Sequence, residues 1–163
     1  MALDLKIKSN VRNVQARYVK FAHKIPPIIT KGIKQAGEQL KTIIVKRTES
    51  GKNVKMKDFT AYSPAYADLK GKITVDLSDT NRMLQSISSR MVNRNTSRIF
   101  FRSPREATKA FFHQTGAGNL PVRKFFGYSK KTEKVIQDTF EKFVKREIRK
   151  LGLWALEKTL HQI

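Results

Sequence analysis

The stretch from Pro27 to Ile44, PIITKGIKQAGEQLKTII, decides the N-terminal half of the fold. Its apolar residues recur every three or four positions, which is the spacing of one helix face. Pro27 suits the first turn of such a helix, because the N–H that proline lacks would have no partner there. Ser50 and Gly51 follow and predict the end of the helix. The buried face is expected to hold Ile29, Ile33, Ala36, Leu40 and Ile43 or Ile44.

The residues before this helix predict an N-terminal arm, extended or helical, over residues 1–25. Within it, residues 10–24 carry apolar side chains at helical spacing among basic ones, so a basic helix is expected there. Pro26 and Pro27 interrupt it, because a proline pushes the residue before it out of the α conformation. The apolar positions of this helix are Val11, Val14, Tyr18 and Phe21.

The middle of the chain predicts a β-hairpin. Residues 87–91 and 98–102 have the composition of two short strands, and the polar turn at residues 93–96 lies between them. A two-stranded hairpin is marginally stable alone, so this one must pair further or pack on a helix.

The segment before the hairpin predicts mostly irregular structure. Residues 52–71 are polar and typical of a loop, and residues 72–76 alternate as a short strand does. Ser78 or Asp79 is placed to cap a short helical turn, which would carry Met83 and Leu84.

Two helix starts follow the hairpin. Ser103, Pro104 and Glu106 fit the N-cap, first and third positions of a helix, where the serine and glutamate side chains can satisfy free amides reciprocally. Gly116 predicts the end of that helix. A loop with a strand-like aromatic stretch, residues 124–128, follows. Ser129 then caps a long C-terminal helix, with an apolar face of Ile136, Phe140, Phe143 or Val144, and Ile148, which Leu151, Trp154 and Leu156 can continue past a bend at Gly152.

The charge of the chain is strongly positive. Its 163 residues include 34 Lys and Arg against 13 Asp and Glu, a formal net charge of +21. The excess is spread along the chain without a run of five like charges. Such charge attracts polyanions such as nucleic acid or acidic protein surfaces. Two interpretations stay open, a generally basic surface and a focused polyanion site.

The composition excludes several classes of protein. The chain has no cysteine, which excludes disulfides, thiolate chemistry and cysteine zinc sites. No apolar run approaches the length that a membrane span needs, so no membrane partner is expected. The first residues lack a secretion signal pattern, and nothing suggests export.

The candidates for catalysis are weak. His23, His113 and His161 are too dispersed for a paired metal site. Glu106 lies two helical turns before His113, so an acid–base pair is conceivable, but a lone histidine near a helix end is more often structural. Asp76 and Asp79 resemble paired metal carboxylates, yet capping explains Asp79 and further oxygen ligands are lacking. We expect no catalytic, cofactor-binding or metal-binding residue, and no enzyme.

A nucleic-acid reader is the next class to consider. Helix-turn-helix, zinc-finger and RNA-recognition patterns are absent from the sequence. The aromatic stretch around residues 124–128 has the composition of a base-stacking platform, because cations flank it. The favoured alternative is that two of its aromatic residues belong to the core and the cations flank a helix start. The residues concerned are Phe125, Phe126 and Tyr128, with Arg123, Lys124, Lys130 and Lys131 beside them.

Four short motifs follow one another along the chain. They are Tyr62, Tyr66 and Lys70; the turn LSDTNRML from Leu77 to Leu84; His113-Gln114-Thr115-Gly116; and Pro121–Gly127 with Arg123 and Phe125. This order resembles the phage virion morphogenesis family, the tail-completion or neck proteins of tailed bacteriophages. The family pattern is Tyr-x3-Tyr-x3-Lys, Leu-x-x-Thr-Gly-x-Met-Leu, His-Gln-x-Gly and Pro-x-Arg-x-Phe-x-Gly. The resemblance covers roughly residues 30–150.

The sequence departs from the family pattern at two positions. Asn81 stands where the family usually has glycine, and asparagine tolerates the left-handed backbone better than other residues do, so the turn is expected to survive. Lys124 replaces the usual second proline beside Phe125.

The resemblance implies an α+β fold, in which helices pack on a small, mostly antiparallel sheet, with long N-terminal and C-terminal helices in a single domain over residues 1–163. It implies a structural virion protein that forms a ring, usually hexameric, at the head–tail junction, with double-stranded DNA passing through it. Its partners would be the head connector or head-completion protein and the tail terminator or tail tube protein. Its location would be the neck or tail of a virion assembled in the bacterial cytoplasm.

The residues that would join subunits are expected in the aromatic segment, because aromatic residues and arginine are favoured in interface cores. The candidates are Arg123, Phe125, Phe126 and Tyr128. The residues that would face DNA are not assigned. Two alternative functions remain, a tail terminator or minor tail protein, and a basic protein that binds nucleic acid without sequence preference.

Overall fold

The computed structural model describes Val19 and residues 21–151. Most of the basic helix expected over residues 10–24 therefore lies outside the described residues. The same holds for the expected bend at Gly152, the helix continuation through Trp154, and His161. No helix within the described part is long and apolar enough to cross a membrane.

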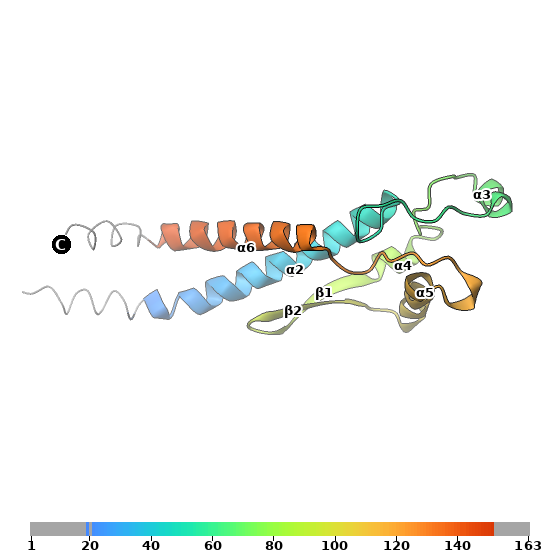
Figure 1. The fold of residues 1–163 in the computed structure, drawn as a ribbon. Helices are drawn as coiled ribbons and strands as arrows, with labels where there is room; N and C mark the ends of the chain where they lie inside the picture. The colour runs from blue at the N-terminus through green and yellow to red at the C-terminus, as the bar shows by residue number, and fades with distance from the viewer. Residues whose placement is uncertain (1–18, 20, 152–163) are drawn as a thin grey trace, which may run out of the picture.

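Helix α2, Ile25–Glu49, is the central element of the fold. Both prolines lie in its first turn, and the expected interruption falls at the turn formed by residues 23–24. Ser50 caps its C-terminal end, and Gly51 follows with a φ of 76°, which confirms the predicted stop. Figure 1 shows α2 between α6 and the hairpin.

The hairpin is confirmed. Strand β1, Ile87–Asn93, pairs antiparallel with β2, Thr96–Phe101, and a bulge lies between Met91 and Asn93. The two strands form a two-stranded sheet that packs on α2, as a marginal hairpin requires. The closest approach is at Gly37, where an added Cβ would lie 2.8 Å from the Ser89 Oγ and 2.9 Å from the Ser97 Cβ.

Helix α6, Lys130–Lys150, packs antiparallel along the other side of α2 (Figure 1). Its predicted cap is present, since the Ser129 side chain accepts a hydrogen bond from the Thr132 N–H. Gly32 of α2 allows the close contact, because a Cβ there would lie 2.9 Å from the Phe140 ring. The predicted α+β class, a small antiparallel sheet packed by long helices, is thereby confirmed.

Short elements gather at the end of the molecule that lies away from the N-terminal end of α2 and the C-terminal end of α6 (Figure 1). They are α3, Pro64–Lys70; α4, Arg82–Gln85; α5, Pro104–Thr115; and the 3-10 turn η1, Ala117–Asn119. Ser103 caps α5 by accepting from the Glu106 N–H. The Glu106 carboxylate does not return the bond as expected; it accepts from the Lys109 Nζ at 3.2 Å.

Four local predictions are wrong. Residues 72–76 form no strand, because their alternation has no partner strand: Ile73 is 88% exposed and Val75 is buried. Residues 52–71 include a helix, α3. The N-cap of α4 is Asn81 rather than Ser78 or Asp79. Residues 124–128 are irregular rather than strand-like, because their amides bond to side chains instead of to a strand.

The core lies where the short elements meet the base of the hairpin and the C-terminal end of α2. Phe125 is fully buried at its centre, and Leu84, Ile44 and Ile87 are nearly so. The remaining core members come from four segments and are Phe59, Val75, Leu77, Met83 and Ala110. The core thus ties the irregular segments to α2 and the sheet.

Candidate functional site

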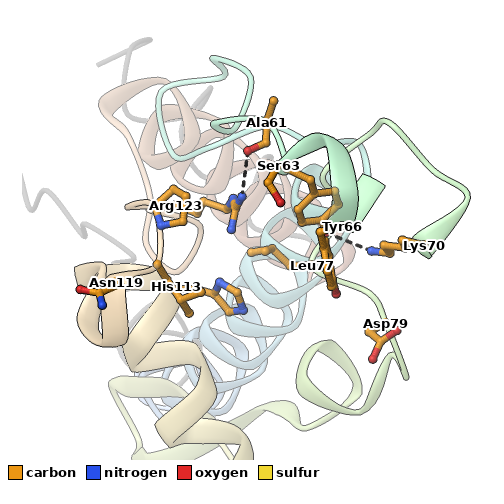
Figure 2. Close-up of a pocket in the computed structure, with 12 residues that line it drawn as sticks. Ala61, Ser63, Tyr66, Lys70, Leu77, Asp79, His113, Asn119 and Arg123 are labelled. Atoms are coloured by element: carbon orange, nitrogen blue, oxygen red, sulfur yellow. Dashed lines mark hydrogen bonds between the residues drawn. The ribbon is translucent and has the colours of Figure 1, made fainter. Parts of the chain in front are cut away.

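An open cleft of about 600 Å³ lies among the four motifs. Figure 2 shows its lining, which includes Tyr66 and Lys70 from α3, His113 from α5, and Arg123 from the loop before α6. Asp79 and Leu77 from the turn before α4 complete one wall. Segments far apart in the sequence therefore meet at one place, and the bonds between them define the site.

Lys70 and Asp76 form the central ion pair of the cleft. The Lys70 Nζ donates to the Asp76 Oδ1 at 2.6 Å and to the Tyr62 hydroxyl at 3.0 Å. The Lys72 Nζ lies 3.5 Å from the other carboxylate oxygen, and the Ser78 N–H also donates to Asp76. Asp76 thus holds the turn before α4 against α3.

These contacts fix the charge of both partners. Burial alone raises the pKa of Asp76, but the hydrogen bonds from Lys70 and Ser78 outweigh it, so this pKa lies below its ordinary value. Burial likewise lowers the pKa of Lys70, and the bonds to Asp76 and Tyr62 reverse the sign, so its pKa is raised. Asp76, which was considered with Asp79 as a metal carboxylate, is instead paired with Lys70 and Lys72.

Arg123 joins the fourth motif to the first. Its Nε and Nη2 donate to the Thr60 carbonyl at 3.1 and 3.0 Å, and Nη2 also donates to the Ala61 carbonyl at 3.2 Å. The guanidinium lies 5.1 Å from the centre of the Tyr62 ring, a cation–π contact. Arg123 is only 3% exposed, so its cation is used within the chain.

His113 faces the cleft from the end of α5 (Figure 2). Burial and the nearby Arg123 cation lower its pKa, so the imidazole is neutral at pH 7. Its Nδ1 is buried without a hydrogen-bond partner, and the Arg123 N–H donates to its carbonyl at 2.7 Å. The conceivable acid–base pair with Glu106 does not form, because that carboxylate is paired with Lys109.

Gln114, the next residue of the third motif, binds the backbone of the fourth motif through its side chain. Its side-chain Oε1 accepts from the N–H groups of Phe125 and Phe126, both at 3.1 Å, and its Nε2 donates to the Phe126 carbonyl at 2.9 Å. The amide side chain therefore takes the place of a neighbouring strand, which is why the aromatic segment is ordered without a sheet.

Arg47 holds the same segment from the other side. It lies near the C-terminal end of α2, and its Nη2 donates to the carbonyls of Phe125 at 2.6 Å and Gly127 at 2.9 Å. The sequence reasoning missed both Gln114 and Arg47 as binding residues. A signal for Arg47 was present, since a cation three residues after Ile44 interrupts the apolar face.

The candidate interface residues divide into two groups. Phe125 is fully buried and Arg123 nearly so, so the expectation of an exposed aromatic segment is wrong for both. Phe126 packs on Phe101 at 4.8 Å between ring centres, at the edge of the core. The favoured alternative to a base-stacking platform, two aromatics in the core, is confirmed. Tyr128 is 59% exposed and keeps a free surface.

The two cations of the cleft, Lys70 and Arg123, are engaged with Asp76, Tyr62 and backbone carbonyls, so the site as built joins segments. Across the described residues, no three histidine and carboxylate side chains gather as metal ligands would. Comparisons of the chain with models of protein families, with curated proteins and with solved structures find no match.

Proposed function

We propose that this chain is a structural virion protein of a tailed bacteriophage, which forms a ring at the head–tail junction, completes the tail and joins it to the head. DNA passes through the ring. The proposal rests on the likeness of four ordered motifs to the virion morphogenesis family. One observation carries it furthest: the four motifs, which span residues 62–127, meet at one cleft. Hydrogen bonds join the third motif to the fourth, Arg123 of the fourth lies over the Tyr62 ring of the first, and Asp76 links Lys70 of the first to Ser78 of the second.

These contacts support the interpretation of the four patterns as parts of one site, because segments that lie far apart in the sequence meet at one place. Tyr62 and Lys70 of the first motif bind the segment that leads into the second through Asp76. Arg123 of the fourth binds beside the first, and Gln114 of the third binds the fourth.

The backbone at Asn81 supports the same alignment. Its φ of 57° is left-handed, the conformation for which glycine is the usual choice. The family has glycine at this position, so the one departure in the second motif keeps the turn that the glycine would serve.

Exposed apolar side chains beside the cleft support a surface for subunit contacts, which differs from most of the residues first expected. Phe111 and Phe112 at the end of α5 are 57% and 41% exposed, and Val122 in the following loop is 50% exposed. Exposed apolar side chains of this size are typical of binding surfaces. We assign the contact between copies of the chain to them, with Tyr128 as a further candidate.

The proposal is tested by deleting the gene for this chain from the phage that carries it. Filled heads and finished tails should accumulate without joining, as seen by electron microscopy, and supplying the intact chain in trans should restore joined particles. Normally joined particles in its absence would overturn the proposal. Cross-linking within the particle separates a neck protein from a tail terminator, which must touch the last tail-tube ring.

A further inference from the structure

The hairpin and its flanks carry charge of one sign only. Residues 80–105 contain six arginines and no lysine, aspartate or glutamate. All six side chains are exposed. The arginines are Arg82, Arg90, Arg94, Arg98, Arg102 and Arg105.

These cations have no ion-pair partner among the described residues. Some basic side chains elsewhere are paired, as Lys150 is with Glu147 at 2.9 Å. Arg90 lies over the Phe100 ring at 4.8 Å, and Arg102 donates to the Gln85 carbonyl at 3.1 Å. Their positive charge therefore remains available to a partner.

The strand register makes this arrangement unfavourable for the protein alone. Arg90 and Arg98 are directly opposite each other across the two strands, and like charges in such a pair destabilise a sheet. Both lie on the face turned away from α2, because the neighbouring Ser89 and Ser97 face Gly37. Arg102 follows Arg98 on the same face, about 13 Å along the strand direction.

Further cations extend this arginine face at both ends of the hairpin. Arg94 in the turn lines a shallow hollow together with Lys31 of α2. Arg82 and Arg102 line a second hollow at the base of the hairpin, together with Glu106, which is buried and paired with Lys109. Positive side chains thus follow the whole length of the hairpin, which suits an extended polyanion better than a small anion.

We infer that the arginine face of the hairpin binds the phosphate backbone of duplex DNA without reading its sequence. The inference rests on the proposed function, in which DNA passes through the ring, and it assigns the contact with that DNA to these arginines. Arginine offers a planar fork that bonds phosphate oxygens in pairs. The face is mainly polar: its apolar side chains are Val92, which is exposed, and Phe100, which is partly buried and lies under the Arg90 guanidinium. The cores of protein–protein interfaces are rich in apolar and aromatic side chains, whereas protein–DNA interfaces are more polar and more positively charged. The composition of this face therefore favours DNA over an acidic protein as its partner.

The test measures binding of the full chain to a fluorescent duplex of about 30 base pairs of arbitrary sequence, by anisotropy over a range of salt concentrations. The hairpin variant is R90Q/R98Q. The matched control is K134Q/K142Q, which removes the same charge from two exposed lysines of α6 that form no ion pair. R94Q, in the turn, is a second variant outside the strand pairing. Thermal unfolding checks each fold, and R90Q/R98Q should keep or raise the melting temperature because a like-charge pair is relieved.

The hairpin variant should weaken DNA binding about tenfold at low salt and lower the slope of log K against log salt by about 1.8, as expected for two lost phosphate contacts. R94Q should weaken binding by a smaller factor, and the α6 control should change it less than R90Q/R98Q does. Equal losses in the hairpin variant and the control, or no binding of the unaltered chain at low salt, would overturn the inference. Poly-glutamate serves as an acidic protein probe in the same assay. A hairpin variant that no longer binds poly-glutamate but still binds DNA as the unaltered chain does would also overturn the inference.

These outcomes are separate from those of the proposed function. Joined particles in the deletion phage, together with lost DNA binding in R90Q/R98Q, would remove the virion role and leave the DNA-binding hairpin. Unjoined particles with unchanged DNA binding would do the reverse.

Discussion

Arg47 is the residue on which the packing of the aromatic segment depends. It is 5% exposed, and burial lowers its pKa. Its Nη2 donates hydrogen bonds to two carbonyls, while its Nε and Nη1 are buried and have no hydrogen-bond partner among the described residues. A buried cation with part of its hydrogen-bonding capacity unused is unfavourable by itself, so the two bonds to the segment at residues 125–127 must offset its desolvation.

Replacing Arg47 with alanine should lower the free energy of unfolding by about 2–4 kcal/mol, because it leaves two buried carbonyls without donors and opens a cavity. Urea denaturation measures the loss. Lys46→Ala, at the exposed neighbouring position on α2, should change stability by less than about 0.5 kcal/mol. Similar effects of the two substitutions would show that Arg47 does not hold the segment.

Asp76 gives the cleft an acid-sensitive contact. Its pKa is lowered in the folded state, so the stability it contributes is present above its ordinary value of 3.8 and is lost as the pH falls through the lower, folded value. Asp76→Asn should destabilise the chain at pH 7 by about 1–3 kcal/mol and flatten the acid limb of the stability profile. Denaturation from pH 2 to pH 7 tests this.

The control for Asp76 is Asp68→Asn, because Asp68 is exposed and its side chain makes no ion pair in the described part of the chain. Its stability profile should follow that of the unaltered protein. An unchanged acid limb in Asp76→Asn would contradict the central role of the ion pair with Lys70.

At the scale of elements, the glycines of α2 show why the helix sits where it does. Gly32 faces the Phe140 ring and Gly37 faces the hairpin, so the two sides of one helix receive α6 and the sheet. A glycine inside a helix costs about 1 kcal/mol relative to alanine. The close approach of neighbouring elements is what offsets this cost.

Gly37→Ala should therefore destabilise the protein by about 1–3 kcal/mol despite the better helix propensity of alanine, because its Cβ would overlap Ser97 and Ser89. Thermal or urea denaturation measures the change. Adding Ser97→Gly should restore part of the loss. Gln35→Ala, exposed on the same helix, should be neutral or slightly stabilising. A stabilised Gly37→Ala would mean that the hairpin does not pack tightly on α2.

Local patterns in the sequence predicted the elements that local chemistry determines. The apolar face of α2, the Ser103 and Ser129 caps and the polar turn of the hairpin each act within a few residues, and all are present. The alternation at residues 72–76 was misleading, because a strand needs a partner that the sequence does not reveal. Arg47 was missed for the same reason: the carbonyls it binds lie 78 and 80 residues away.

At the scale of the whole molecule, the exposed apolar side chains and the arginine face lie in different parts of the fold. The motifs and the cleft gather at one end, and α2 and α6 run together toward the other (Figure 1). The exposed apolar side chains of α5 and the following loop lie at the motif end, on segments that line the cleft. The arginine face lies on the hairpin, whose opposite face packs against the middle of α2. A ring built through the apolar residues would leave the hairpins free to meet DNA.

This division predicts that assembly and DNA binding can be separated by substitution. Phe111→Ser with Val122→Ser should abolish the ring, because two exposed apolar side chains are removed from the proposed contact and none from the core. Native mass spectrometry should show a closed ring for the unaltered protein and single chains for this double variant. Val135→Ser, which alters an exposed valine of α6, should keep the ring. Rings that persist in the double variant would place the subunit contact elsewhere, with Tyr128 the next residue to replace.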